Sequence, residues 1–297
     1  MSIYYLIALL AALTWSISSL ISADVTREVG SIAFNRLRLL LVSIILISYT
    51  TYIDTWSTID QSFLLLILFS GIIGIFLGDT LLFMALQKIG PRRNNILFSL
   101  AAPFTVILNI IFLNHLMNTI SLIGCFVVFL GVVVAIIYGT EKDNQHRWEV
   151  IEGSIYIGVI MGIFAALCQA IGLIIMKPIL DSGADPIASA ALRTSASFIL
   201  ISFTFFIKSS AFKSKEKINI KIISKIFISG FLGMALGMSL LLIALQKGDA
   251  GIVATLSSTS PIIILFLIWF LTNKIPTLGA WLGTTIAIIG TGLIFIY

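Results

Sequence analysis

The sequence contains very little charge for its length. Lys, Arg, Asp and Glu make up 10% of the 297 residues, whereas 59% are hydrophobic. This polar content is too small to cover a globule in water, so the composition excludes an ordinary soluble domain and indicates a membrane protein. The longest hydrophilic pieces are 139–154 and 208–221, which leaves no room for a soluble catalytic domain.

Cysteine and histidine are also scarce, with two residues of each. Cys125 and Cys168 lie inside apolar segments without a CxxC neighbour, so we expect reduced thiols that act as small hydrophobic side chains. His115 and His146 lack metal-ligand spacing, and we expect no metal and no other cofactor. Because HExxH and paired carboxylates are missing, an intramembrane enzyme is disfavoured. No P-loop is present, which excludes ATP hydrolysis by this chain as the energy source.

Long apolar windows recur along the whole chain. Each has about 20 residues, which is enough for a helix to cross the hydrocarbon core and too long for a barrel strand. Helices satisfy their own backbone polar groups in lipid, so we expect an all-α integral membrane protein with ten transmembrane helices. Nothing basic precedes the first window, so we expect it to be retained and not cleaved as a signal peptide. The expected helices are 3–21, 32–52, 62–86, 95–113, 119–138, 155–176, 187–207, 222–245, 252–272 and 277–297.

The basic residues are distributed unevenly between the loops. Of the 18 Lys and Arg residues, 13 fall in odd-numbered loops and only Lys177 and Lys247 fall in even-numbered loops. The positive-inside rule then places the odd loops in the cytoplasm and both termini outside, and we expect a prokaryotic plasma membrane. The lysines between 208 and 225 fit this topology, with contact to anionic lipid headgroups. Aromatic residues are not interleaved with them, so no nucleic acid is expected as a partner.

An internal repeat organises the chain. The stretch Gly71–Lys88 recurs as Gly230–Lys247 with ten identities at an offset of 159. SIAFNRLR and PIASAALR align at an offset of 155, which pairs Arg38 with Arg193. Self-similarity at one long period indicates a duplicated unit.

The duplication predicts two units of five helices each. We expect them at 1–138 and 155–297, with 139–154 as the charged linker between them. An odd number of helices per unit makes the second unit enter the membrane from the opposite side. Such inverted repeats are typical of secondary transporters, which bind substrate near the midplane between the repeats.

Glycines recur at matching places in the third and eighth windows. At 100° per residue most of them fall on a narrow stripe of each helix, which allows close backbone approach. This spacing most often reflects helix packing without a further function. The predicted packing residues are Gly71, Gly74, Gly78, Gly230, Gly233 and Gly237.

The chain resembles the EamA family of the drug/metabolite transporter superfamily. The resemblance is carried by ALTW at Ala12–Trp15, an arginine early in the second and seventh windows, GDTLLFMALQKIG at Gly78–Gly90, LSSTSP at Leu256–Pro261, and the GxxxxxxG pairs Gly124–Gly131 and Gly283–Gly290. It implies two five-helix repeats and a transport function. The sequence departs from the family at His115 and Lys274, where members often carry Glu, so any role of that Glu is not carried over. Relatives are often drawn with cytoplasmic termini, whereas the charges here favour the opposite orientation.

Asp79 is the only acidic residue well inside an expected helix, and the second repeat has Met238 in its place. A carboxylate at the bilayer centre costs about 2.5–3.5 kcal/mol, so Asp79 should face the bundle interior or a wet cavity. It could carry a proton, neutralise a substrate ammonium, or form a purely structural ion pair. Arg38 and Arg193 could be its partners, although we expect both to act as anchors at helix ends.

Polar residues precede a proline in the fourth and ninth windows. Pro103 and Pro261 are expected to kink their helices, and nearby hydroxyl groups could either satisfy the freed carbonyls or line a cavity. Trp15 could line the same cavity or anchor at the interface. The candidate cavity residues are Asp79, Asn95, Ser99, Asn109, Trp15, Gln169, Ser257, Ser258 and Thr259.

These observations favour a transporter over an enzyme. We expect a secondary transporter that moves a small metabolite, amino-acid-like or otherwise polar or amphipathic, by alternating access with proton coupling through Asp79. A lipid-handling or flippase-like member of the same superfamily is the main alternative. The expected partners are a small solute and membrane lipid.

Overall fold

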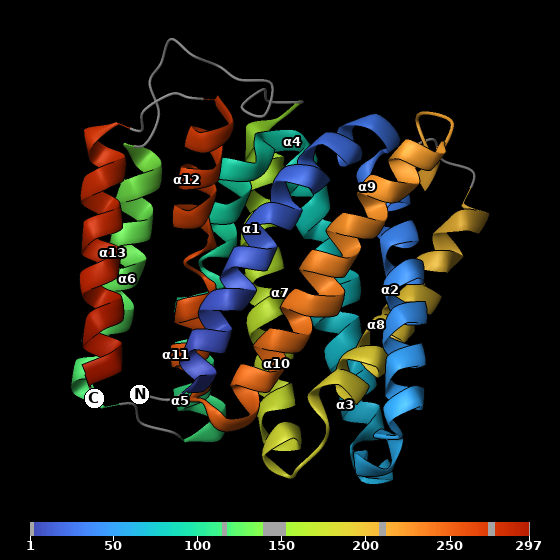
Figure 1. Ribbon diagram of the computed structural model, residues 1–297, viewed down its shortest axis with the longest axis horizontal. Helices are drawn as coiled ribbons and strands as arrows, with labels where there is room; N and C mark the ends of the chain where they lie inside the picture. The colour runs from blue at the N-terminus through green and yellow to red at the C-terminus, as the bar shows by residue number, and fades with distance from the viewer. Residues whose placement is uncertain (1–2, 115–117, 139–152, 208–211, 273–276, 297) are drawn as a thin grey trace.

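The computed structural model describes residues 3–114, 118–138, 153–207, 212–272 and 277–296 (Figure 1). Within these ranges all regular structure is helical, as the sequence predicts. The first half contains α1 (Ile3–Val29), α2 (Ser31–Ile53), η1 (Trp56–Thr58), η2 (Gln61–Phe63), α3 (Leu64–Gly71), η3 (Ile72–Leu77), α4 (Gly78–Phe98), α5 (Ala101–Leu113) and α6 (Thr119–Ile137). The second half contains α7 (Ile155–Asp181), α8 (Pro186–Ser202), η5 (Phe203–Phe206), α9 (Ile220–Gly230), η7 (Phe231–Leu236), α10 (Gly237–Lys247), α11 (Ala250–Ser257), α12 (Ser260–Thr272) and α13 (Leu278–Ile296).

Seven helical segments of the described chain are long and apolar enough to cross a membrane. Three shorter apolar helices, Ala101–Leu113, Thr119–Gly131 and Trp281–Gly290, lie in the expected fourth, fifth and tenth windows. The molecule is therefore an integral membrane protein by helix length and composition. The count of ten complete crossings stays a prediction.

Large apolar side chains cover the outside of the bundle. Leu65 is 78% exposed, Phe112 67% and Phe270 77%. Apolar surface of this extent would be unfavourable against water, but it matches a lipid environment. The polar residues of the membrane segments lie inside instead, which leaves a polar centre within an apolar shell.

Each repeat contains a π-helical turn that the sequence analysis did not predict. The π segments Ile72–Leu77 and Phe231–Leu236 occupy equivalent places at the offset of the repeat, and each ends immediately before a glycine. A π turn holds more residues than an α turn, so the predicted angles of 100° per residue do not apply through these segments. The following residues, which include Asp79, are rotated relative to a continuous α-helix.

The glycine helix of each repeat packs against the first two helices of the other repeat. The segment from α3 to α4 lies against α7 and α8, and the segment from α9 to α10 lies against α1 and α2. Gly71 meets the Arg193 backbone, where an added Cβ would lie 2.6 Å from the carbonyl oxygen, and Gly230 meets the Arg38 side chain at 3.0 Å. The predicted close packing of glycines is present, and it joins the two halves of the chain.

Because each repeat packs its glycine-containing segment on the first two helices of the other repeat, the bundle has an approximate two-fold arrangement. In Figure 1, α1 rises from the edge where the described ends of the chain lie, whereas α7 runs down toward that edge. At the side of the bundle α6 packs against α13 through Gly131 and Gly290, both of which touch backbone atoms of the partner helix. The first helices of the two halves, α1 and α7, therefore run in opposite directions, and the last helices, α6 and α13, pack against each other.

The two prolines that the sequence singles out, Pro103 and Pro261, stand just after helix breaks. Ser99 and Leu100 separate α4 from α5, and Pro103 lies in the first turn of α5. Pro261 lies likewise at the start of α12. A proline in the first turn removes an N–H that has no intrahelical acceptor, so the interruption appears as a break before the proline and not as a kink at it. A further break at Gly90, with φ of +78°, precedes Pro91 inside α4.

Candidate functional site

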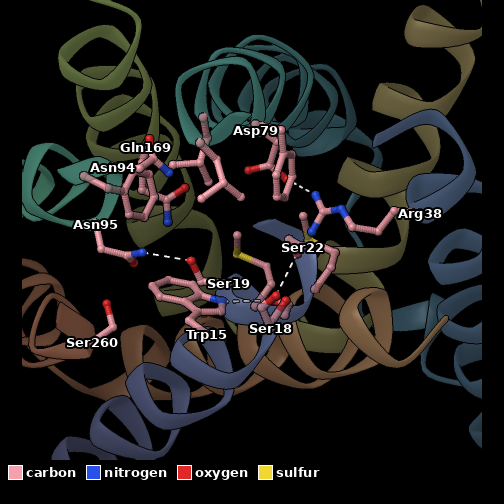
Figure 2. A pocket seen from close by; sticks show the side chains of 17 residues that line it. Trp15, Ser18, Ser19, Ser22, Arg38, Asp79, Asn94, Asn95, Gln169 and Ser260 are labelled. Carbon is pink, nitrogen blue, oxygen red and sulfur yellow. Dashed lines mark hydrogen bonds and ion pairs between the residues drawn. The ribbon is translucent and has the colours of Figure 1, made fainter. Parts of the chain in front are cut away.

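A small pocket, with a cavity volume of about 60 Å³, lies between the two halves of the bundle (Figure 2). Its walls combine aromatic and aliphatic side chains with hydroxyl, amide and charged groups. Helices α1, α2 and α4 supply Trp15, Ser18, Ser19, Ser22, Arg38, Asp79, Leu82, Phe83, Leu86, Asn94, Asn95 and Phe98. The second half supplies Gln169, Gly233, Met234, Met238 and Ser260.

An ion pair between Arg38 and Asp79 forms the charged part of the pocket. Arg38 donates through Nη2 to the Asp79 carboxylate, and through Nε and Nη2 to Asn35 Oδ1 at 3.3 and 3.1 Å. Its guanidinium group also lies over the Phe83 ring at 4.5 Å from the centroid, a favourable cation–π geometry. The two charged side chains are 3% and 6% exposed. Arg38 is therefore a buried partner of Asp79, and the expectation of an anchor at the helix end is wrong.

Trp15 belongs to the pocket wall and joins the two repeats. Its Nε1 donates to the Gly233 carbonyl oxygen at 2.7 Å, and its ring meets Phe98 edge to face. A Cβ on Gly237 would lie 2.7 Å from the indole, so the glycine makes room for the ring. Of the two roles left open by the sequence, the structure places Trp15 at the cavity.

Three serines of α1, Ser18, Ser19 and Ser22, also line the pocket, although they are not among the candidate cavity residues given above. Ser18 donates to the Ser229 carbonyl oxygen at 2.9 Å, and the Ser22 and Ser229 hydroxyls are 2.6 Å apart. Ser19 accepts from Asn95 at 2.8 Å. The cluster of hydroxyl side chains after Trp15 could have indicated this wall of the pocket, because Ser18 and Ser22 are four residues apart and lie on one face of the helix.

The amide side chains gather across the pocket from the ion pair, as Figure 2 shows for Asn94, Asn95 and Gln169. Asn95 donates to Ser19 and to the Pro91 carbonyl oxygen. Within the described part of the chain, Asn94 Oδ1 and Gln169 Nε2 are buried without a hydrogen-bond partner. A buried polar atom without a partner costs about 1–3 kcal/mol, so a bound solute that met these amides would gain binding energy.

The remaining candidates lie elsewhere. Ser99 is buried away from the pocket lining, and Asn109 lines a second, polar pocket, where it donates to Asp249 at 3.1 Å. Ser257 and Thr259 donate to carbonyls of their own segment at 3.0 and 2.8 Å, and Ser258 is not among the lining residues. The hydroxyls before Pro261 thus mainly donate to backbone carbonyl oxygens at the helix break, whereas Ser260 reaches the pocket.

Some predicted features fall outside the described residues. These are His115, Lys274 and the linker between 139 and 152. Among the described residues, no group of three His, Cys, Asp or Glu side chains is arranged to hold a metal ion. Cys125 and Cys168 are both free thiols.

Comparison with known proteins supplies a family and a fold. The model of the EamA-like transporter family matches residues 2–137 and 156–296. Comparison with curated proteins gives no match. A solved structure described as "Crystal structure of protein" has a TM-score of 0.79 and 15% sequence identity, and the alignment covers 100% of this chain and 97% of that chain. At this identity the likeness concerns the fold alone.

Proposed function

The chain belongs to the EamA-like transporter family, and from this premise we propose that it is a secondary transporter for a small polar or amphipathic solute. The observation that carries the proposal is the pocket between the halves, whose buried walls hold an ion pair and two unpartnered amide atoms. Both matched regions of the chain contribute to this pocket. We propose that it is the solute site.

We propose alternating access as the transport mechanism. Opposed repeats around a central site are the common basis for rocking motions in secondary transporters. Contacts such as Trp15 to Gly233 cross between the repeats beside the pocket. Rocking one half against the other would break such contacts on one side of the solute and form equivalent contacts on the other side.

The pocket walls support an amphipathic, amino-acid-like solute. Trp15, Phe83 and Phe98 offer apolar surface, while Asn94 and Gln169 offer hydrogen bonds. Ligand sites of this kind use the apolar walls for affinity and a few polar groups for orientation. The arrangement thus fits a small molecule with both characters.

Asp79 is proposed to carry the coupling proton. It is the one buried carboxylate among the described residues, and it lies in the pocket next to Arg38. While Arg38 holds it, Asp79 is stabilised as an anion. If a bound solute shares Arg38, the Asp79 carboxylate loses part of its compensation in the membrane interior and gains stability by binding a proton.

The test begins with a ligand search on the purified full chain. Thermal stabilisation is screened over amino acids, sugars, nucleotides and lipid precursors, because a ligand that favours the folded state raises stability by mass action. The best ligand is then used for uptake into proteoliposomes with an imposed pH gradient. Asp79→Asn should abolish the acceleration of uptake by the pH gradient while leaving exchange of labelled for unlabelled solute measurable.

The control is Asp54→Asn. Asp54 is exposed at the end of α2 with φ of +57°, a conformation that Asn adopts readily, so this variant should behave like the wild type. Full gradient-driven uptake by Asp79→Asn would refute the coupling role. A chain that moves none of the solutes that stabilise it would contradict the transporter proposal itself.

Lipid handling is a second candidate, favoured by an apolar pocket between α5 and α6. Its cavity volume is about 370 Å³, and it is lined by Pro103, Val106, Phe126 and Phe129 among other apolar residues. An acyl chain would suit such walls. If lipid precursors stabilise the protein and water-soluble solutes do not, this alternative replaces the solute carrier.

A further inference from the structure

The two repeats contain equivalent arginines but only one carboxylate. Arg38 of α2 corresponds to Arg193 of α8, and Asp79 of α4 corresponds to Met238 of α10. The structure keeps this correspondence, because Arg38 donates to Asp79, whereas Arg193 donates through Nη1 to the Met238 sulfur at 3.6 Å. A thioether is a weak and neutral acceptor, so Met238 does not supply the counterion that Asp79 supplies to Arg38.

Arg193 is completely buried, and few groups compensate its positive charge. Its exposed fraction is 0%, and Nε and Nη2 have no hydrogen-bond partner within the part of the chain that the structure describes. Two glycines press against it, since a Cβ on Gly74 or Gly172 would lie 3.0 or 3.2 Å from Nη2. An arginine stays protonated in proteins, so the fold holds a buried positive charge that lacks its full set of partners.

The centre of the bundle therefore has an excess of positive charge. Among the described residues, the buried charged side chains are Arg38, Asp79 and Arg193. One carboxylate cannot balance two guanidinium groups, and a charge in this low-dielectric region attracts an anion far more strongly than a surface charge does. Met238 both contacts Arg193 and lines the pocket, so a single flexible side chain separates this charge from a bound molecule.

We propose that the transported solute is an organic anion with one negative charge and an apolar body. This inference rests on the proposed function, because it specifies the solute for the same pocket. Arg38 uses Nε and Nη2 for its bonds to Asn35 and Asp79, which leaves Nη1 for the anionic group. Arg193 adds attraction from behind Met238, and the apolar body packs against the aromatic side chains of the wall.

The first test compares matched probes that share an apolar body and differ in the charge of their polar group. Three sets are used with the purified full chain: benzoate, benzamide and benzylamine; 3-phenylpropionate, 3-phenylpropanamide and 3-phenylpropylamine; indole-3-acetate, indole-3-acetamide and tryptamine. Thermal stabilisation should show binding of the anion roughly tenfold tighter than its amide in at least one set, because hydrogen bonds to charged groups are stronger than neutral ones. If no anion stabilises the protein more than its amide does, or the amines bind best, the proposal is wrong.

The second test restores the missing carboxylate. Met238→Asp places an acid opposite Arg193 and should remove the preference for anions, whereas Met238→Leu should retain it. Without any ligand, Met238→Asp should unfold at a temperature close to that of Met238→Leu. Leu241→Asp, which buries an acid in the apolar core of the same helix, should be clearly less stable.

The results separate this inference from the proposed function. A Met238→Asp protein as unstable as Leu241→Asp would show that Arg193 has no uncompensated charge, and it would overturn the inference directly. A neutral or cationic solute that is transported through the pocket would also overturn it, yet would leave the transporter proposal intact. The transporter proposal fails only if no stabilising solute is moved.

Discussion

At the scale of single residues, the ion pair between Arg38 and Asp79 is the feature that distinguishes this pocket from an ordinary packed core. The sequence identified Asp79 as unusual because a carboxylate inside a membrane helix needs a reason. It offered Arg38 as a possible partner but favoured an anchor role, because the arginine's position near a helix end fitted a place at the interface. The break at Gly30, with φ of +89°, lets α2 turn back at once and buries Arg38 in the bundle.

Removing one member of this pair should be far more harmful than removing both. We expect Asp79→Ala to lower the free energy of unfolding by about 3–5 kcal/mol, because it leaves the Arg38 guanidinium buried without its counterion. The double variant Arg38→Met/Asp79→Leu should recover most of that loss, since apolar side chains replace both charges. Equilibrium unfolding in detergent, measured for the single and double variants, gives the coupling energy. A double variant that loses the sum of the two single losses would show that the pair is not coupled.

At the scale of helices, the glycine segments explain how two units of one sequence pattern form one bundle. Each packs against the first two helices of the other unit, and each contains a π turn at the same place. The glycine spacing was readable because close packing of helices depends on small residues. The π turns could not be predicted from the sequence, because neither repeat has a proline or an insertion at that point to signal an extra residue in the turn.

A methyl group at this contact should disrupt it. We expect Gly71→Ala to cost about 1–3 kcal/mol, because its Cβ would lie 2.6 Å from a backbone oxygen of Arg193 that cannot rotate away. The matched control is Gly292→Ala on α13, where nothing lies within 4 Å and the higher helix propensity of alanine should leave stability equal or slightly raised. Thermal unfolding of both variants in detergent is the measurement. Equal stability of the two would mean that α3 and α8 can separate without penalty.

At the scale of the whole molecule, the two halves are opposed in direction and share one polar centre. The pocket draws twelve of its lining residues from the first half and five from the second. Neither half could bury this polar set alone, so the site exists only in the assembled bundle. The described ends of the chain lie together at one edge of the bundle (Figure 1).

The distribution of lysine and arginine predicts how this bundle is oriented in the membrane. A reporter fused to the C-terminus should be found outside the cytoplasm, on the side opposite the lysine-rich loop between α8 and α9. Fusions that are active only on one side of the membrane provide the measurement, and a second reporter within that loop is the control. A cytoplasmic C-terminal reporter would show that the charge distribution does not determine the orientation.

Composition and local spacing are enough to predict the class of protein and its internal organisation. Low charge and long apolar windows determine a helical membrane protein, the repeated stretch beginning at Gly71 determines the duplication, and the glycine spacing determines where helices approach closely. Which polar residues meet depends instead on the folded arrangement of the helices. Arg38 and Asp79 are 41 positions apart within the first repeat, and Trp15 and Gly233 are 218 apart in different repeats, so each contact depends on how the helices pack and not on the residues beside it in the chain. The same packing places Arg193 against Met238, in the way that Arg38 lies against Asp79, and so leaves Arg193 without a carboxylate there.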